Sequence, residues 1–176
     1  MRRAVFLDRD GVINVKAPEG QYITRWEDFQ FLPGVAGAIA LLQEASFTVI
    51  VVSNQRGVGK GLMTANDLEA IHSRMLAELA ASGARIDAIY YCPHDLDARC
   101  ACRKPEPGML LQAAKDHAID LPNSWMVGDS DSDILAGKRA GCRTARIVRS
   151  DASSGVPSDL TCQTLGEAVQ AIIKEP

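Results

Sequence analysis

The chain has 176 residues, the size of one compact domain, and we expect residues 1–176 to form a single domain. Its hydrophobic fraction of 47% and charged fraction of 23% exclude disordered, collagen-like and low-complexity proteins. A net charge of −3 provides no basic field for nucleic acid or an anionic membrane, so any anionic partner must be bound by local cations.

Short apolar segments alternate with helical patterns along the chain. In order, the sequence predicts a strand at 4–7, a helix at 35–45, a strand at 47–52, a helix at 65–82, a strand at 88–91, a helix at 108–118, a strand at 125–127, a helix at 132–140, a strand at 144–148 and a helix at 167–174. Thr64 and Asp67 can form a capping box on the second helix, and Gly83 is placed to end it. Residues 150–158, rich in Ser and Gly, are expected to form a loop.

This alternation predicts an α/β fold. Strands of four to six residues separated by helices form βαβ crossovers, which give a three-layer, Rossmann-like parallel sheet with helices on both faces. No insertion is long enough for a large cap domain, so we expect an open site.

The apolar segments also predict a cytoplasmic protein that does not enter a membrane. Even the run at 47–52 is far shorter than the roughly 18 residues that span a bilayer. The apolar segment 4–7, after the basic residues 2 and 3, is too short for the core of a signal peptide. The five cysteines are an odd number, which disfavours a disulfide framework. The size favours a monomer.

Carboxylates follow two of the predicted strands, at the edge where sites form in open α/β sheets. Asp8 and Asp10 follow the first strand two positions apart, and an extended chain would place both on the same side. Asp129 follows the fourth strand. A D-x-D-G segment taken alone is a simple Asp- and Gly-rich turn in roughly half of cases. With Asp129 added, the hard oxygens of three repelling carboxylates favour a Mg²⁺ site.

Ser53 and Lys104 add the donors that phosphoryl transfer needs. A hydroxyl at a strand end can donate to a phosphoryl oxygen, and an ammonium can neutralise a carboxylate together with a phosphate dianion. Taken singly, such a serine is usually a turn former and a lone lysine is usually in solvent. Together with the three aspartates they predict a phosphoryl-transfer site.

On these residues the sequence resembles the haloacid dehalogenase superfamily of phosphatases. Its four motifs match residues 8–12, Ser53, Lys104 and residues 128–129 with Asp133, and the resemblance covers almost the whole chain. It implies that Asp8 is the nucleophile that forms an aspartyl phosphate, and that Asp10 is first a general acid and then a general base. It also implies a Mg²⁺ ion held by the Asp8 side chain, the Asp10 backbone carbonyl and Asp129, with Asp133 behind them.

A second metal pattern, C-x-H-x₅-C-x-C, is formed by Cys92, His94, Cys100 and Cys102. Three thiolates and an imidazole suit a closed tetrahedral Zn²⁺ site, which leaves no position for a substrate and is therefore structural. The alternative is a group of unligated thiols in a surface loop, which would be an oxidation liability. Arg103 and Lys104 follow the last cysteine directly, so we expect zinc to order the loop that carries both cations.

The zinc loop looks like the subgroup that contains D,D-heptose 1,7-bisphosphate phosphatases and the histidinol-phosphate phosphatase domain. Segments 53–61 and 103–110, and Asn14 with residues 22–29, favour the heptose branch. The implied substrate is a small sugar phosphate, and the implied reaction removes the 7-phosphate of a heptose bisphosphate in the synthesis of lipopolysaccharide or a related glycan. Substrate contacts are expected from Asn54, Gln55, Arg56 and Arg103. Arg103 is the first candidate for the second phosphate and Arg56 the second, because a guanidinium can bind phosphate through two hydrogen bonds.

Two other functions compete with this one. Histidinol-phosphate phosphatase activity is the enzymatic alternative, and a zinc-stabilised binding module without catalysis is the other. The second is weakened because a competent residue fills every catalytic position. Nucleic acid is disfavoured as a partner, since the sequence does not interleave basic and aromatic residues.

Overall fold

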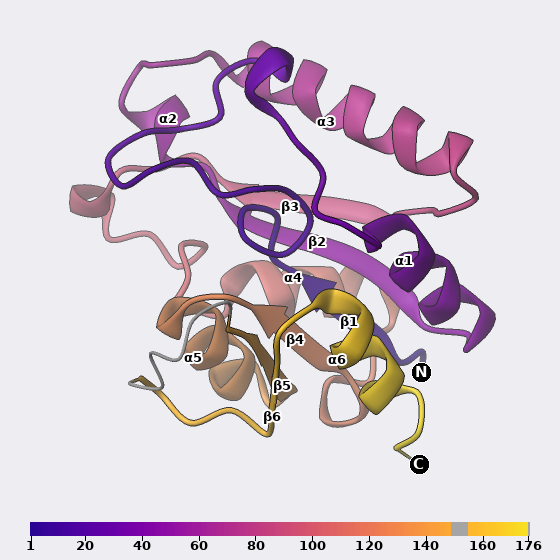
Figure 1. Cartoon of the computed structure of the whole chain (residues 1–176). Coiled ribbons are helices and arrows are strands. Elements are labelled where there is room, and N and C mark those ends of the chain that lie inside the picture. The colour runs from indigo at the N-terminus through magenta and orange to yellow at the C-terminus, as the bar shows by residue number, and fades with distance from the viewer. Residues whose placement is uncertain (149–154, 176) are drawn as a thin grey trace.

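The computed structural model describes residues 1–148 and 155–175, and in them one parallel sheet forms the centre of the molecule (Figure 1). The strand order is β3-β2-β1-β4-β5-β6, and each pair of neighbours is parallel. The strands are β1 (Ala4–Leu7), β2 (Thr48–Asn54), β3 (Ala88–Cys92), β4 (Trp125–Gly128), β5 (Arg143–Ile147) and β6 (Leu160–Cys162). This order reverses direction between β1 and β4, the place where open α/β sheets bind ligands.

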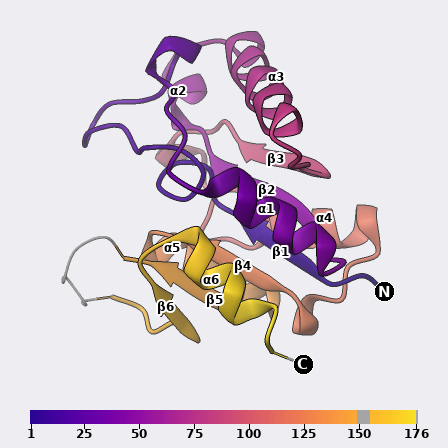
Figure 2. The ribbon, with the colours of Figure 1, turned by 45° about the vertical axis from the view of Figure 1, so that its right-hand side comes forward.

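Helices cover both faces of the sheet. They are α1 (Val35–Glu44), α2 (Arg56–Gly59), α3 (Ala65–Ala81), α4 (Gly108–His117), α5 (Asp131–Ala140) and α6 (Leu165–Ile172), with 3-10 turns at Trp26–Asp28, Leu96–Ala98 and Leu121–Asn123. Helices α1, α3 and α6 share one hydrophobic cluster, and α4 and α5 share the other. Figures 1 and 2 show α1 and α6 side by side on their face. The predicted three-layer α/β fold is confirmed.

Alternating side chains of the central strands supply both cores. In β1, Val5 and Leu7 pack toward α1 and α6, whereas Phe6 packs toward α4 and α5. Each such fully buried side chain stabilises the fold by about 1.5–3 kcal/mol. Because a register shift of one residue would exchange the two cores, the register of β1 is fixed. The polar residues that follow Leu7 are thereby held at the carboxyl edge of the sheet.

The sequence predicted the elements in their correct order but missed two. The capping box of Thr64 and Asp67 is present, and Gly83 ends α3 at φ +78°. The structure adds β6 and the four-residue α2, and it places α6 two residues earlier than predicted. Residues 150–154 of the predicted loop lie outside the described residues. Among the residues described, no helix has both the length and the apolar composition to cross a bilayer.

Candidate active site and metal sites

The carboxyl ends of β1, β2 and β4 bring the predicted phosphoryl-transfer residues to one edge. Asp8 continues β1, and its backbone N–H donates to the carbonyl of Val127 at 2.9 Å. Ser53 lies inside β2, which runs two residues further than the sequence indicated. Asp129 comes directly after β4. Because neighbouring strands fix these positions, the three residues reach the same edge of the sheet without any long flexible segment between them and the core.

Lys104 lies at the centre of this group and is almost completely buried. Its ammonium is 2.9 Å from Asp8 Oδ1 and 2.6 Å from Asp133 Oδ1, and it donates to the carbonyl of Val52 at 2.7 Å. Burial disfavours the charged lysine, but the attraction of Asp133 and Asp8 outweighs burial and raises the pKa of Lys104. The backbone of Lys104 is held by Asn54, whose side-chain amide exchanges two hydrogen bonds of 3.0 Å with it.

Three carboxylates form a group suited to a metal ion. One oxygen each of Asp8, Asp129 and Asp133 lies within 4.8 Å of the others. Burial, and then repulsion by Asp133, raises the pKa of Asp8 to about 7 in spite of Lys104. Asp129 Oδ1 is buried and has no hydrogen-bond partner among the described residues. A divalent cation would relieve both conditions, so the residues fit the predicted Mg²⁺.

Two glycines allow the close approach of these carboxylates. Gly11 has φ +98°, and a Cβ atom on it would overlap the carboxylate of Asp129. A Cβ atom on Gly128 would overlap the side chain of Asp133. Glycine is therefore required at both positions by the packing of the site and, at Gly11, also by the backbone.

Asp10 points into a separate hydrogen-bond network. Its carboxylate accepts two bonds of 3.0 Å from Arg9 and bonds of 2.9 Å from Asn14 and Gln55. Burial alone would raise the pKa of Asp10, but the Arg9 charge and these hydrogen bonds lower it below its ordinary value. The Gln55 amide also donates to Ser53 Oγ at 2.8 Å, which links Asp10 to the serine.

Sequence reasoning missed two contributors to this network. Arg9 is only 1% exposed, and its guanidinium lies 3.3 Å from His72 Nε2 of α3. A charged residue two positions after a buried strand was the available signal for Arg9. His72 carried no such signal, because one histidine among the apolar positions of a helix is usually a core residue.

A third missed residue is Lys16, in the segment between β1 and α1. Its ammonium lies 2.9 Å from Asp129 Oδ2. Burial works against the charge, but the hydrogen bond to Asp129 and the nearby carboxylates of Asp8 and Asp133 raise the pKa of Lys16. No motif marks a lysine in an irregular segment, so the sequence offered no means of finding this contact.

The four predicted zinc ligands come together at the end of β3, where Cys92 is the last residue of the strand and the other three follow it. Cys102 Sγ lies 3.1 Å from Cys92 Sγ and 3.3 Å from Cys100 Sγ, and His94 Nδ1 lies 3.3 Å from Cys102 Sγ. Two sulfurs bound to one tetrahedral Zn²⁺ would be about 3.8 Å apart, so a small expansion of the group would accommodate the ion. The four side chains fit the chemistry of a closed zinc site.

The residues predicted to contact substrate already make different contacts within the protein. Asn54 and Gln55 use their side-chain amides within the site. Arg56 pairs with Asp95 of the zinc loop. Arg103 is half-buried and donates to the carbonyl of His94 at 3.4 Å. These contacts place both arginines beside the zinc loop, while their roles toward substrate stay predictions.

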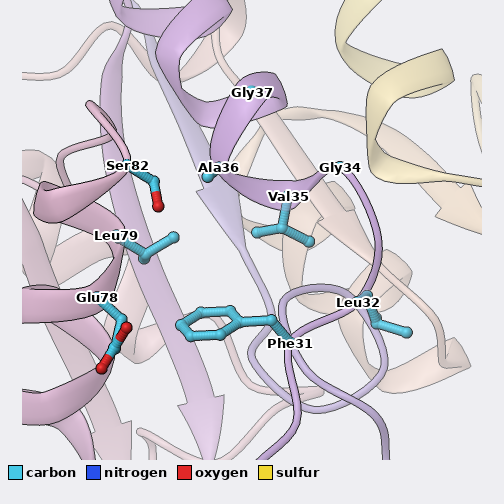
Figure 3. Close-up of a pocket in the computed structure, with 9 residues that line it drawn as sticks. All are labelled: Phe31, Leu32, Gly34, Val35, Ala36, Gly37, Glu78, Leu79 and Ser82. Atoms are coloured by element: carbon cyan, nitrogen blue, oxygen red, sulfur yellow. The ribbon is translucent and has the colours of Figure 1, made fainter.

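A hollow of about 230 Å³ lies between the start of α1 and the end of α3 (Figure 3). The side chains of Phe31, Val35 and Leu79 point into it. None of its lining residues belongs to the predicted catalytic or metal-binding set. The hollow is therefore separate from the carboxylate edge.

Known proteins resemble this chain over nearly its full length. Residues 101–161 match a family model described as HAD-hydrolase-like. The chain is 46% identical to a D-glycero-beta-D-manno-heptose-1,7-bisphosphate 7-phosphatase of Rhodopseudomonas palustris, over 85% of this chain and 86% of that one. It is 40% identical to a D-glycero-alpha-D-manno-heptose-1,7-bisphosphate 7-phosphatase of Mycobacterium bovis, over 96% and 90% of the two chains. The crystal structure of a D,D-heptose 1,7-bisphosphate phosphatase from B. bronchiseptica, complexed with magnesium and phosphate, has a TM-score of 0.91 and 36% identity over 99% of both chains.

Proposed function

The chain belongs to the family of D-glycero-D-manno-heptose-1,7-bisphosphate 7-phosphatases, and we propose that it catalyses the reaction for which these relatives are named. The substrate is a D-glycero-D-manno-heptose 1,7-bisphosphate, and the products are the heptose 1-phosphate and inorganic phosphate. The observation that carries the proposal is the placement of Asp8 in contact with the Lys104 ammonium and within one group with the carboxylates of Asp129 and Asp133.

Asp8 acts as the nucleophile in this proposal. Its carboxylate attacks the phosphorus of the 7-phosphate, and the bond from phosphorus to the sugar oxygen breaks, which leaves an aspartyl phosphate. Lys104 holds Asp8 in place through Oδ1 and offsets negative charge as the phosphoryl group is transferred. Ser53, which already bonds to Gln55, donates its hydroxyl hydrogen to a phosphoryl oxygen.

Asp10 handles the proton in both halves of the reaction. Asp10 must carry a proton when the reaction begins, although Arg9 and its other donors lower its pKa in the free protein. It donates this proton to the sugar oxygen as that oxygen leaves, and it regains one from the water that attacks the phosphorus of the aspartyl phosphate. This returns Asp8 to its free form and releases phosphate. The hydrogen bonds from Arg9, Asn14 and Gln55 orient Asp10 between these steps.

Both metals have protein ligands in the proposal. Asp8, Asp129 and the Asp10 backbone carbonyl hold Mg²⁺, which when bound supplies positive charge to an anionic substrate. Asp133 keeps Lys104 in place and is not assigned as a direct ligand. Cys92, His94, Cys100 and Cys102 hold a structural Zn²⁺ that orders the segment leading to Arg103 and Lys104.

A side-by-side comparison of kcat/KM tests the proposal. The substrates are both anomers of the heptose 1,7-bisphosphate, since the relatives are named for one or the other, together with histidinol phosphate and fructose 1,6-bisphosphate. The proposal predicts the highest value for one heptose anomer. A higher value for histidinol phosphate would overturn the substrate, and unchanged turnover in Asp8→Asn would overturn the mechanism.

A further inference from the structure

Lys16 places a positive charge beside Asp129, a carboxylate that the proposed magnesium site needs as a ligand. The segment between β1 and α1 brings its ammonium to 2.9 Å from Asp129 Oδ2, although the two residues are 113 positions apart in the chain. The Lys16 side chain is 55% exposed and that of Asp129 is 19% exposed. The contact therefore lies at the mouth of the site, where the lysine can turn out into solvent.

The charges of the site are divided between two lysines. Lys104 lies within salt-bridge distance of Asp8 and Asp133, and it is buried with them. Asp129 is the third carboxylate of the group, and its Oδ2 is paired with Lys16. The other oxygen of Asp129 is the buried atom without a hydrogen-bond partner among the described residues.

We propose that Lys16 competes with Mg²⁺ for Asp129 and thereby sets the affinity of the site for the metal. Two positive charges close to one carboxylate repel each other, so Mg²⁺ binding must weaken or displace the lysine. The flexible four-carbon stem of an exposed lysine lets the ammonium leave at little cost. Lys16 thus stabilises the carboxylates when no metal is bound, and it lowers the affinity of the site for Mg²⁺.

The test is a calorimetric titration of the zinc-loaded full chain with MgCl₂. Lys16→Gln should bind Mg²⁺ several-fold more tightly than the natural chain, up to about fivefold, the factor that corresponds to about 1 kcal/mol for an exposed ion pair. Lys115→Gln, on the exposed side of α4, makes the same change in net charge and should leave the Kd unchanged. Lys16→Arg keeps the charge and should also retain the natural Kd.

Thermal unfolding gives a second readout that does not depend on activity. Without metal, Lys16→Gln should unfold at a lower temperature than the natural chain, because Asp129 loses its cation. At one fixed MgCl₂ concentration, its Tm should rise more than that of the natural chain.

The inference rests on the proposed magnesium site, and the outcomes separate the two. An equal or weaker affinity in Lys16→Gln would overturn the role of Lys16 alone. No Mg²⁺ binding in the natural chain or in any variant would overturn the magnesium site as well.

Discussion

The ammonium of Lys104 and the carboxylate of Asp133 form an ion pair of 2.6 Å in which both side chains are almost fully removed from water. Helix α5 presents Asp133 in its first turn, where the residue also completes a capping box with Ser130. The same aspartate therefore caps a helix and fixes the lysine that contacts Asp8. This connects the stability of α5 to the geometry of the proposed nucleophile.

Lys104→Met should destabilise the protein strongly, because it leaves the buried carboxylates of Asp8 and Asp133 without their shared cation. We expect a loss of about 3–5 kcal/mol in the free energy of unfolding, measured by urea denaturation without metal. Lys115→Met, at an exposed position, should change it by less than about 0.5 kcal/mol. A cost for Lys104→Met as small as that of the control would show that the pair does not stabilise the fold.

Gly11→Ala should impair metal binding more than it impairs folding. A methyl group at this position would displace the carboxylate of Asp129, and misplacement of a catalytic group by about 1 Å can cost about 10²-fold in rate. Gly83→Ala is the matched control, since Gly83 also has positive φ but no atom within 4 Å of the added Cβ. Both variants should lose about 1 kcal/mol of stability from backbone strain. Only Gly11→Ala should lose Mg²⁺ affinity and kcat, and an equal loss in Gly83→Ala would contradict the interpretation.

Cys102→Ser should reduce the zinc content and lower kcat/KM, because the loop that leads into Arg103 and Lys104 loses its cross-link. Zinc can be measured by elemental analysis of the purified protein. Cys162→Ser, in β6 and outside the cluster, should keep both the metal and the activity. If Cys102→Ser lost zinc but retained natural kinetics, zinc would have no part in arranging the active site.

His72 should make the protein less stable in acid. Burial, followed by the charge of Arg9, lowers the pKa of His72 to about 4, whereas an unfolded histidine titrates near about 6.5. Between these values the unfolded chain binds a proton that the folded chain does not, so stability falls as the pH falls from about 6.5 to about 4. The full contribution is about 3 kcal/mol.

The pH dependence of urea unfolding for natural and variant chains measures this contribution. His72→Gln should remove that part of the acid sensitivity, because the neutral amide takes up no proton. His117→Gln, at the partly exposed end of α4, should keep the natural profile. Identical profiles for His72→Gln and the natural chain would show that His72 is not the group responsible.

The convergence of the aspartates could be predicted because parallel strands deliver their following residues to one edge. Asp8 and Asp129 follow neighbouring strands, and the motif spacing placed Lys104 and Ser53 with them. The zinc ligands could be predicted as well, since all four lie within one segment of eleven residues.

What the sequence did not reveal depends on contacts between distant segments. The pairs Lys16–Asp129 and Arg9–His72 join positions 113 and 63 residues apart, and no local pattern encodes them. Strand β6 was missed because its three residues, two partly buried and one exposed, show no apolar run. Local patterns therefore specified the framework, and the packing of irregular segments decided which charged groups meet.

Covalent catalysis by Asp8 is tested by trapping the phosphorylated enzyme. The zinc- and magnesium-loaded protein is mixed with its heptose 1,7-bisphosphate, quenched in acid within one turnover and digested for mass spectrometry. If the mechanism is right, Asp8 gains the mass of one phosphoryl group, and Asp8→Asn shows no such addition. Release of phosphate with no modified peptide, or with the group on another residue, would contradict it.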